Sequence, residues 1–317
     1  MLAISVDKGD VIGFGAINMD KIISVDTIPK KDEEVFVTDL ELHPGGSAAN
    51  TIVGLAKLEM KAGIMGKVGN DEDGDLLMQD FRIEGVDTTA VIRAGARSRS
   101  GSAMVLVDKE GNRAIIVDPG VNDTIHYDEM DLDHISNFRL LHLTSFICKE
   151  SEGSLEEQKR LVDSFEGEVS FDPGMVYARR GINGLRGLLS FTRIFMPNEA
   201  EVKILTGKDY RKGAAILLEE GPGIVVVKLG SRGCYITDGV QETEVPADPV
   251  KVVDTTGAGD AFNAGFIFGY LKDLELEKCG RLGNVVAGHC IQHKGARKGL
   301  PHLKDIDLNY GQTNLTD

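Results

Sequence analysis

The chain reads Val252-Val253-Asp254-Thr255-Thr256-Gly257-Ala258-Gly259-Asp260 at the point where a strand pattern gives way to a helical pattern. The Val252-Val253 pair is typical of the end of a strand. The three polar residues that follow carry side-chain oxygens of the kind that cap a helix start. Phe262, Phe266 and Leu271 give the next segment an apolar body. We therefore expect a strand end, a short turn and a buried helix here.

The turn itself is built from small residues that suit an anion. Gly257, Ala258 and Gly259 leave backbone N–H groups accessible at a helix start, where partial positive charge collects. Asp260 follows in the first helical turn, and a carboxylate there can accept the proton of a hydroxyl that attacks phosphorus. A capped, Gly-rich helix start with an acid favoured by the helix dipole explains the same residues, so this segment alone leaves both interpretations open.

Composition excludes several classes of protein. The 317 residues carry 50 acids against 35 bases, a net charge of −15, which argues against a general nucleic-acid binder. The four cysteines show no C-x-x-C spacing, and a chain of this size needs no disulfides, so we expect reduced thiols in a cytoplasmic protein. Asp7, Lys8 and Asp10 interrupt the N-terminal apolar runs, so no cleavable signal is expected, and no run approaches the ~20 apolar residues of a membrane span.

The rest of the chain alternates short apolar strands with helical segments, which predicts a doubly wound, mostly parallel α/β sheet flanked by helices. The first strand is expected at 11–17, followed by a helix that reaches about residue 59. The later strands are expected at 140–144, 169–172, 193–196 and 224–228. The helices between them are expected near 152–166, 179–190 and 198–220. Residues 1–317 are expected to form one domain.

Two segments do not fit the buried pattern. Residues 21–43 and 97–118 contain half-exposed alternating strands, and the second segment has a hairpin turn at 109–112. We expect these strands to form a small β-sheet lid over the site, inserted in the α/β domain. An apolar lid face would also suit a homodimer contact.

Several motifs of this chain occur together in one known family. They are D-T-x-G-A-G-D at 254–260, G-G-x-x-x-N at 45–50, G-x-V-G-x-D-x-x-G at 66–74, N-x-x-E at 198–201 and K-L-G-S-R-G at 228–233. In these motifs, and over about residues 10–305, the chain resembles the ribokinase-like (PfkB-type) carbohydrate and nucleoside kinases. The resemblance implies an ATP-dependent kinase in which Asp260 is the general base and the Gly257, Ala258 and Gly259 amides form an anion hole.

The resemblance also implies the roles of further residues. The acceptor-binding residues would be Asn18, Asp20, Gly45, Gly46 and Asn50. The nucleotide-binding residues would be Asn198, Lys228, Gly230, Ser231, Gly233 and Asn284. Asn198 and Glu201 would hold Mg²⁺, mostly through water, although their spacing alone favours a capping box. Carbonyls around Asp254 and Thr256 match a monovalent-cation site of many relatives, so K⁺ is a further expected cofactor.

The acceptor stays open at this point. Thr144-Ser145-Phe146 stands where ribokinase proper carries a glutamate. A nucleoside acceptor would need an apolar wall, which Phe36 or Met104 could supply. A keto-sugar acid would need an arginine such as Arg97 or Arg99.

Other classes of function also stay open. A binding protein that kept the fold and lost the chemistry is an alternative. An NAD oxidoreductase is disfavoured because Asn18 stands where the third glycine of a dinucleotide fingerprint would be, and no Walker A motif occurs, which disfavours a P-loop kinase.

Overall fold

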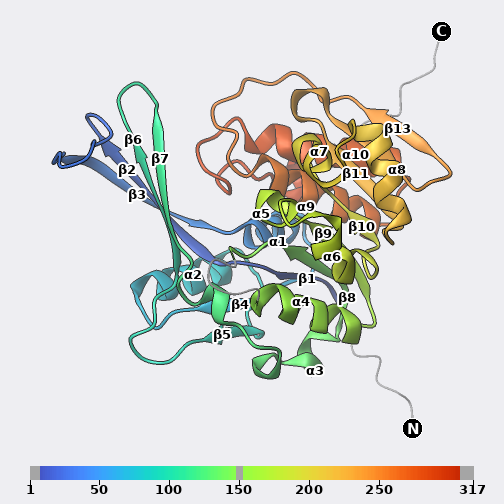
Figure 1. The fold of residues 1–317 in the computed structure, drawn as a ribbon, viewed down its shortest axis with the longest axis horizontal. Coiled ribbons are helices and arrows are strands. Elements are labelled where there is room, and N and C mark those ends of the chain that lie inside the picture. The colour runs from blue at the N-terminus through green and yellow to red at the C-terminus, as the bar shows by residue number, and fades with distance from the viewer. Residues whose placement is uncertain (1–7, 148–152, 308–317) are drawn as a thin grey trace.

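A nine-stranded sheet forms the centre of the computed structural model, which describes residues 8–147 and 153–307 (Figure 1). The strand order is β13-β12-β11-β10-β9-β8-β1-β4-β5. All pairs from β11 to β5 are parallel, whereas β12 and β13 are antiparallel additions at one edge. The predicted doubly wound, mostly parallel sheet is therefore confirmed.

The strands of this sheet are β1 Gly9–Phe14, β4 Ala62–Val68, β5 Val91–Arg93, β8 Phe138–Thr144, β9 Glu168–Asp172, β10 Ile194–Phe195, β11 Ile224–Lys228, β12 Cys234–Thr237 and β13 Glu242–Val245. The helices are α1 Ser47–Lys57, α2 Glu72–Ile83, α3 Leu132–Ile135, α4 Gly153–Ser164, α5 Gly174–Ala178, α6 Gly181–Leu189, α7 Glu199–Thr206, α8 Tyr210–Glu219, α9 Ala258–Leu271 and α10 Leu276–Cys290. Parallel strands need crossover connections, which is why helices separate most of the central strands.

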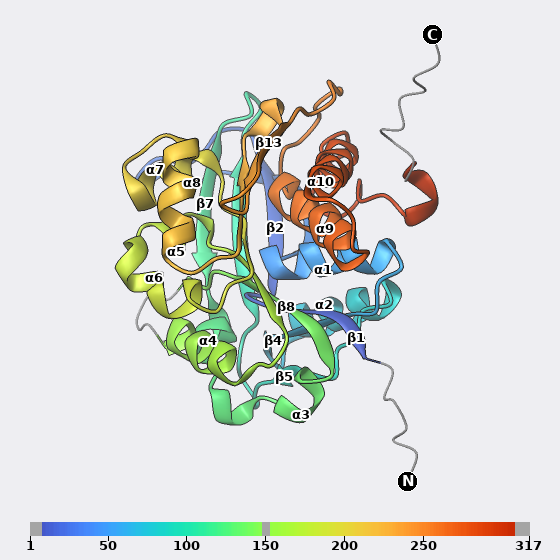
Figure 2. The same cartoon turned by 90° about the vertical axis from the view of Figure 1, so that its right-hand side faces the viewer.

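Helices cover both faces of the sheet (Figure 2). On one face α1, α2, α9 and α10 bury a core that includes Ile52, Phe81 and Phe266. On the other face α4, α5, α6, α7 and α8 bury a second core that includes Phe171 and Tyr177. Because both faces are covered, the central strands read as continuous apolar runs rather than as alternating ones.

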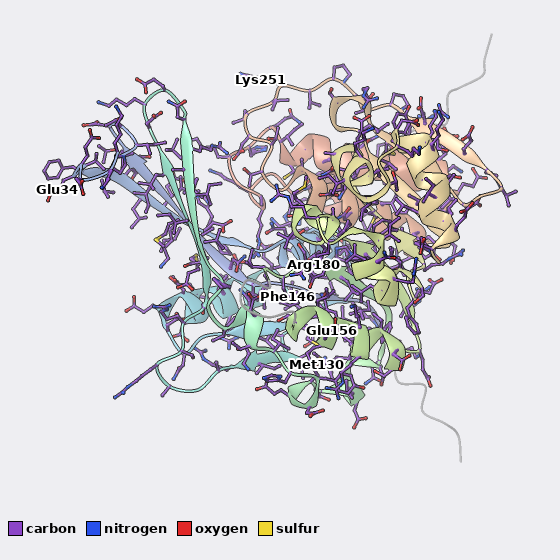
Figure 3. All side chains as sticks on the ribbon, in the orientation of Figure 1. Glu34, Met130, Phe146, Glu156, Arg180 and Lys251 are labelled. Atoms are coloured by element: carbon purple, nitrogen blue, oxygen red, sulfur yellow. The ribbon has the colours of Figure 1, made fainter. Side chains whose placement is uncertain are left out.

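A separate four-stranded sheet projects from the body, and its order is β3-β2-β6-β7 (Figure 1). Its strands are β2 Asn18–Val25, β3 Val37–Gly45, β6 Gly101–Val107 and β7 Arg113–Asp118. The β6–β7 hairpin forms as predicted, and Glu34 lies at the far end of this sheet (Figure 3). Several apolar side chains on it are exposed: Phe36, Val37, Leu40, Leu42, Ile115, Ile116 and Val117. The homodimer contact at this lid stays a prediction.

Two sequence-based expectations are wrong. Val252 and Val253 belong to no strand; both side chains are about half exposed, and the Val253 N–H donates to the Ile291 carbonyl. The helix expected at 198–220 is two helices, because Gly207 takes a left-handed conformation (φ 71°) that ends α7, and Asp209 caps α8. Residues 246–256, which follow β13, form neither helix nor strand, and the local composition gave no sign of this.

Three cysteines, Cys234, Cys279 and Cys290, are buried free thiols, and Cys148 lies outside the described residues. Burial raises the pKa of each of the three to about 12, which keeps them protonated and unreactive. Among the described residues, no helix has the length and apolar character that crossing a membrane requires. The cytoplasmic location stays a prediction.

Candidate active site

Asp260 lies in the first turn of α9, where side chains from α1 contact both of its carboxylate oxygens. Ser47 donates its hydroxyl to Oδ1 at 2.5 Å, and Asn50 donates its amide to Oδ2 at 2.8 Å. Both donors come from α1, which packs against α9. The structure therefore brings together Asp260, the predicted general base, and Asn50, a predicted acceptor-binding residue.

The surroundings of Asp260 tune its basicity. Burial raises the pKa of this carboxyl to about 6, the hydrogen bonds from Ser47 and Asn50 oppose that rise, and the charge of Asp172 adds to it. A pKa of about 6 leaves the carboxylate ionised at neutral pH and close to the range that favours proton transfer. The acid can thus hold a negative charge and still accept a proton.

The start of α9 differs in detail from the expectation. Its N-cap is Gly257 in a left-handed conformation (φ 76°), and no side chain of a described residue caps it. Asp254 instead accepts hydrogen bonds from Thr256 and from the Gly295 N–H, so it ties the turn to the segment after α10. The Ala258 N–H donates to the Thr255 carbonyl at 3.2 Å. The first N–H groups of a helix have no partner within the helix, so Gly259 and Asp260 still present donors at this end.

Lys228 lies beside the same helix start and belongs to a buried polar cluster. Its ammonium forms an ion pair with Asp172 and contacts Asn263 Oδ1 at 3.3 Å. Asn263 Nδ2 donates to Asp172 Oδ2 at 2.6 Å. Burial alone would raise the pKa of Asp172, but the Lys228 charge and these hydrogen bonds lower it. The lysine Nζ lies 3.6 Å from where a Cβ on Gly259 would stand, so the ammonium is a direct neighbour of this helix start.

The predicted acceptor residues meet where the lid joins the body. Asn18 and Asp20 lie at the start of β2 rather than at the end of β1, and Gly45 ends the paired strand β3. A Cβ on Gly45 would come within 2.4 Å of the Asp20 carboxylate, so the glycine makes room for that acid. Burial raises the pKa of Asp20 to about 6, against the opposing charges of Arg297 and His43. Gly46 is the N-cap of α1, and its φ of 101° is a conformation that glycine adopts readily.

The sequence analysis missed five residues of this site: Ser47, Asn122, Asp172, Asn263 and Arg297. Asn122 donates to Asn18 Oδ1 at 2.8 Å, and Arg297 donates to Asn50 Oδ1 at 2.8 Å. For Asp172 the strand-end position was a usable signal, because ligands gather at the carboxyl ends of parallel strands. The other four have no local signal, since each acts on a residue far away in the chain.

Phe146 does not face the acceptor region. It is fully buried, near the middle of the molecule, and its ring packs edge-on against Phe14 at 5.3 Å (Figure 3). The segment that departs from ribokinase proper therefore supplies core packing at this position.

A cavity of about 560 Å³ lies next to the start of α9. Five of the six predicted nucleotide-binding residues line it: Lys228, Gly230, Ser231, Gly233 and Asn284. Its other walls include the apolar side chains of Val250, Phe262 and Ile291. A cavity with apolar walls, several glycines and a helix N-terminus in its lining has the groups that a nucleotide requires.

Asn198 and Glu201 form a capping box at the start of α7. The Asn198 N–H donates to Glu201 Oε2 at 2.8 Å, and the Glu201 N–H donates to Asn198 Oδ1 at 2.9 Å. Burial and the charge of Asp172 raise the pKa of Glu201 to about 7, with Lys228 opposing. Glu201 and Asp172 are thus two buried acids near Lys228. Their carboxylate oxygens are hard donors of the kind that Mg²⁺ prefers. In the described parts of the chain no three His, Cys, Asp or Glu residues converge on a metal site, so water and phosphate oxygens would complete the coordination.

The raised pKa of Glu201 predicts a pH-dependent stability. Between about pH 4.5 and 7 the folded state binds more protons at this residue than the unfolded state, so the free energy of unfolding should fall as pH rises through that range. We expect Glu201→Gln to reduce this fall by about 1–3 kcal/mol. Urea unfolding of both proteins at pH 5 and pH 8, without Mg²⁺, measures it. Asp20 and Asp260 should leave a residual slope, and an unchanged slope in the variant would contradict the assignment.

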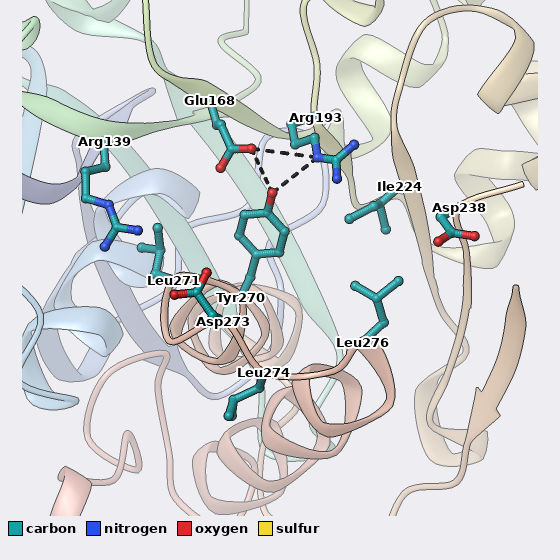
Figure 4. A pocket seen from close by; sticks show the side chains of 10 residues that line it. All are labelled: Arg139, Glu168, Arg193, Ile224, Asp238, Tyr270, Leu271, Asp273, Leu274 and Leu276. Carbon is teal, nitrogen blue, oxygen red and sulfur yellow. Dashed lines mark hydrogen bonds and ion pairs between the residues drawn. The ribbon is translucent and has the colours of Figure 1, made fainter. Parts of the chain in front are cut away.

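A second cavity of about 420 Å³ lies at the opposite ends of the strands, by the C-terminal end of α9 (Figure 4). Tyr270 stands at its centre, donates to Glu168 at 2.8 Å and accepts from Arg193 at 3.2 Å. Tyr270, Glu168 and Arg193 therefore satisfy one another's hydrogen bonds, which leaves this trio with a structural explanation. The site built around Asp260 is therefore the better candidate for chemistry.

Comparison with known proteins agrees with this geometry. A family model described as pfkB family carbohydrate kinase matches residues 8–303. An Archaeoglobus fulgidus protein described as an uncharacterized sugar kinase is 55% identical and covers 80% of this chain and 100% of its own. A Halopiger xanaduensis protein described as ATP-dependent ribose-1-phosphate kinase is 32% identical over 90% of this chain and 93% of its own. The structure of an Arabidopsis thaliana ribokinase complexed with ribose and ATP is 27% identical, with a TM-score of 0.81 over 94% and 97% of the two chains.

Proposed function

The chain belongs to the pfkB family of carbohydrate kinases, and it is therefore a phosphotransferase that acts on a sugar hydroxyl; from this premise we propose that it phosphorylates a pentose, either ribose or ribose 1-phosphate, with ATP. The observation that carries the proposal is the position of Asp260. It lies in the helix start that borders the nucleotide-sized cavity, and it is hydrogen-bonded to Asn50, one of the predicted acceptor residues.

Asp260 is the general base of this proposal. Its carboxylate is held by Ser47 and Asn50, so its oxygens keep a fixed direction before an acceptor arrives. An acceptor hydroxyl would take the place of one of these donors and transfer its proton to the freed oxygen. Such a positioned base contributes about 10²–10⁴-fold to the rate.

Lys228 and the amides at the start of α9 stabilise negative charge. The lysine is pre-positioned by Asp172 and Asn263, so it needs little reorganisation to meet a phosphoryl group. Asn198 and Glu201 are the residues that would hold Mg²⁺, together with its water. Bound ATP would supply the phosphoryl group, and Mg²⁺ would neutralise charge on its oxygens. The K⁺ site at Asp254 and Thr256 stays a prediction.

The acceptor site presents both donors and acceptors, as a polyhydroxy compound requires. Asn122 occupies the Asn18 oxygen, so Asn18 offers its NH₂ group, whereas Asp20 offers carboxylate oxygens. A pentose acceptor is supported by the name of the Halopiger relative and by the ribose in the Arabidopsis complex. Phe36 is exposed and Met104 is half-buried on the lid, and these two apolar side chains are the reason to include nucleosides among the acceptors tested.

The test is ATP-dependent ADP formation with Mg²⁺ against ribose, ribose 1-phosphate, hexoses, keto-sugar acids and nucleosides. We expect the highest kcat/KM with ribose or ribose 1-phosphate, and NMR of the product identifies the phosphorylated hydroxyl. A tenfold or greater preference for a nucleoside or a keto-sugar acid would overturn the pentose proposal.

A further inference from the structure

Arg297 is a buried arginine whose guanidinium joins four segments of the chain. It is only 8% exposed, and it follows α10. Its Nε donates to Asn50 Oδ1 at 2.8 Å, its Nη2 donates to the Gly45 carbonyl at 3.2 Å, and its Nη1 forms an ion pair with Asp80 of α2. The guanidinium carbon also lies 5.4 Å from the centre of the Phe81 ring.

These contacts determine which way the Asn50 amide faces. A carboxamide carries its oxygen and its nitrogen on opposite sides, and the oxygen can only accept hydrogen bonds. Because Arg297 occupies Oδ1, Nδ2 must point the other way, and there it donates to Asp260 Oδ2 at 2.8 Å. If the amide were turned over, its oxygen would face a carboxylate oxygen, and two acceptors would oppose each other.

We propose that Arg297 is a positioning residue that fixes the orientation of the Asn50 amide and so keeps a donor on the carboxylate of Asp260. The functional part of this inference rests on the proposed function, in which Asp260 is the base. The arginine does not touch the acceptor in this account. It acts on the base through Asn50, across a relay of two hydrogen bonds, and Phe81 and Asp80 hold the relay in place.

Other charged groups surround the relay, and the test must separate their effects. Asp172 and Lys228 act on Asp260 from the strand side, Cys290 faces it from α10, and Asp254 faces Cys290 from the turn before α9. Asp20, Asp80 and Glu84 face Arg297, and His43 faces Asp20. Removing the arginine charge could change the pKa of Asp260 directly. A double-variant cycle through Asn50 cancels that direct effect, because the direct effect persists when Asn50 is absent.

The experiment titrates Asp260 itself in the full-length protein, by ¹³C-carboxyl NMR of aspartate-labelled protein, with Asp260→Asn to identify its signal. The proteins are wild type, Arg297→Met, Asn50→Ala and the double variant. Arg297→Met should raise the apparent pKa of Asp260 by about one unit in the wild-type background and by much less in the Asn50→Ala background. Asp80→Asn is the matched control, since it weakens the ion pair, leaves the Nε contact and should not raise the pKa.

The proposal is overturned if Arg297→Met raises the pKa equally in both backgrounds, or not at all. If Arg297→Met does not fold, Arg297→Gln enters the same cycle. Kinetics then address the base separately, using ATP and the best acceptor of the panel. The acid limb of the kcat/KM profile should move up with the pKa of Asp260. A limb that stays in place while the NMR pKa moves would leave the role of Arg297 intact and would remove Asp260 as the base.

Discussion

Replacing Asp260 with asparagine is expected to lower kcat by about 10²–10⁴-fold, the usual contribution of a positioned general base. Asparagine has the same shape but cannot take up the acceptor proton. Its oxygen can still accept from Ser47, so the helix start should survive. The measurement is steady-state ADP formation with the best acceptor, together with ATP affinity by calorimetry. We expect ATP binding to change little while turnover collapses.

The matched control for this variant is Asp163→Asn, at an exposed position on α4. It should keep wild-type kcat and thermal midpoint. An Asp260→Asn protein that turns over within threefold of wild type would show that the acceptor loses its proton to another group. It would then also remove the reason to link Arg297 to catalysis.

Replacing Lys228 with methionine is expected to have the largest effect on stability. The lysine and Asp172 are 12% and 8% exposed, so removing the ammonium leaves a buried carboxylate with two neutral donors, Asn263 and the Gly174 N–H, and no opposite charge in this cluster. Breaking such a pair from one side costs about 3–5 kcal/mol. We also expect kcat/KM to fall by about 10²–10³-fold, because a charge-stabilising donor beside Gly259 is lost. Urea unfolding and steady-state kinetics measure the two effects.

Two further proteins separate the causes. Lys228→Met combined with Asp172→Asn should regain much of the lost stability, because no unpaired charge stays buried, and it should not regain activity. Lys212→Met, at an exposed ion pair on α8, should cost less than about 1 kcal/mol. Equal stability of Lys228→Met and Lys212→Met would contradict the buried-pair assignment.

The sequence predicted the sheet and its lid because both depend on short periodic patterns. Apolar runs at 140–144 and 224–228 fall within β8 and β11, and the turn at 109–112 joins β6 to β7. The capping box predicted for Asn198 and Glu201 is also present. It could be predicted because its two hydrogen bonds join residues only three positions apart. Predictions failed where a local pattern had a distant cause. Val252 and Val253 look like a strand, but the antiparallel β12 and β13 already occupy that edge of the sheet.

For the site, the sequence by itself predicted the position of the Gly-rich helix start and of Asp260 directly after it, and α9 begins there. That these residues carry the chemistry is the proposal made above. A helix start depends on neighbours within about four residues, so its residues can be read in order. Only the tertiary structure decided what holds Asp260 and Lys228. Arg297 lies 247 residues from Asn50, and Asn263 lies 91 residues from Asp172. Buried polar groups must find partners wherever packing places them, and packing joins segments whose separation leaves no trace in local sequence.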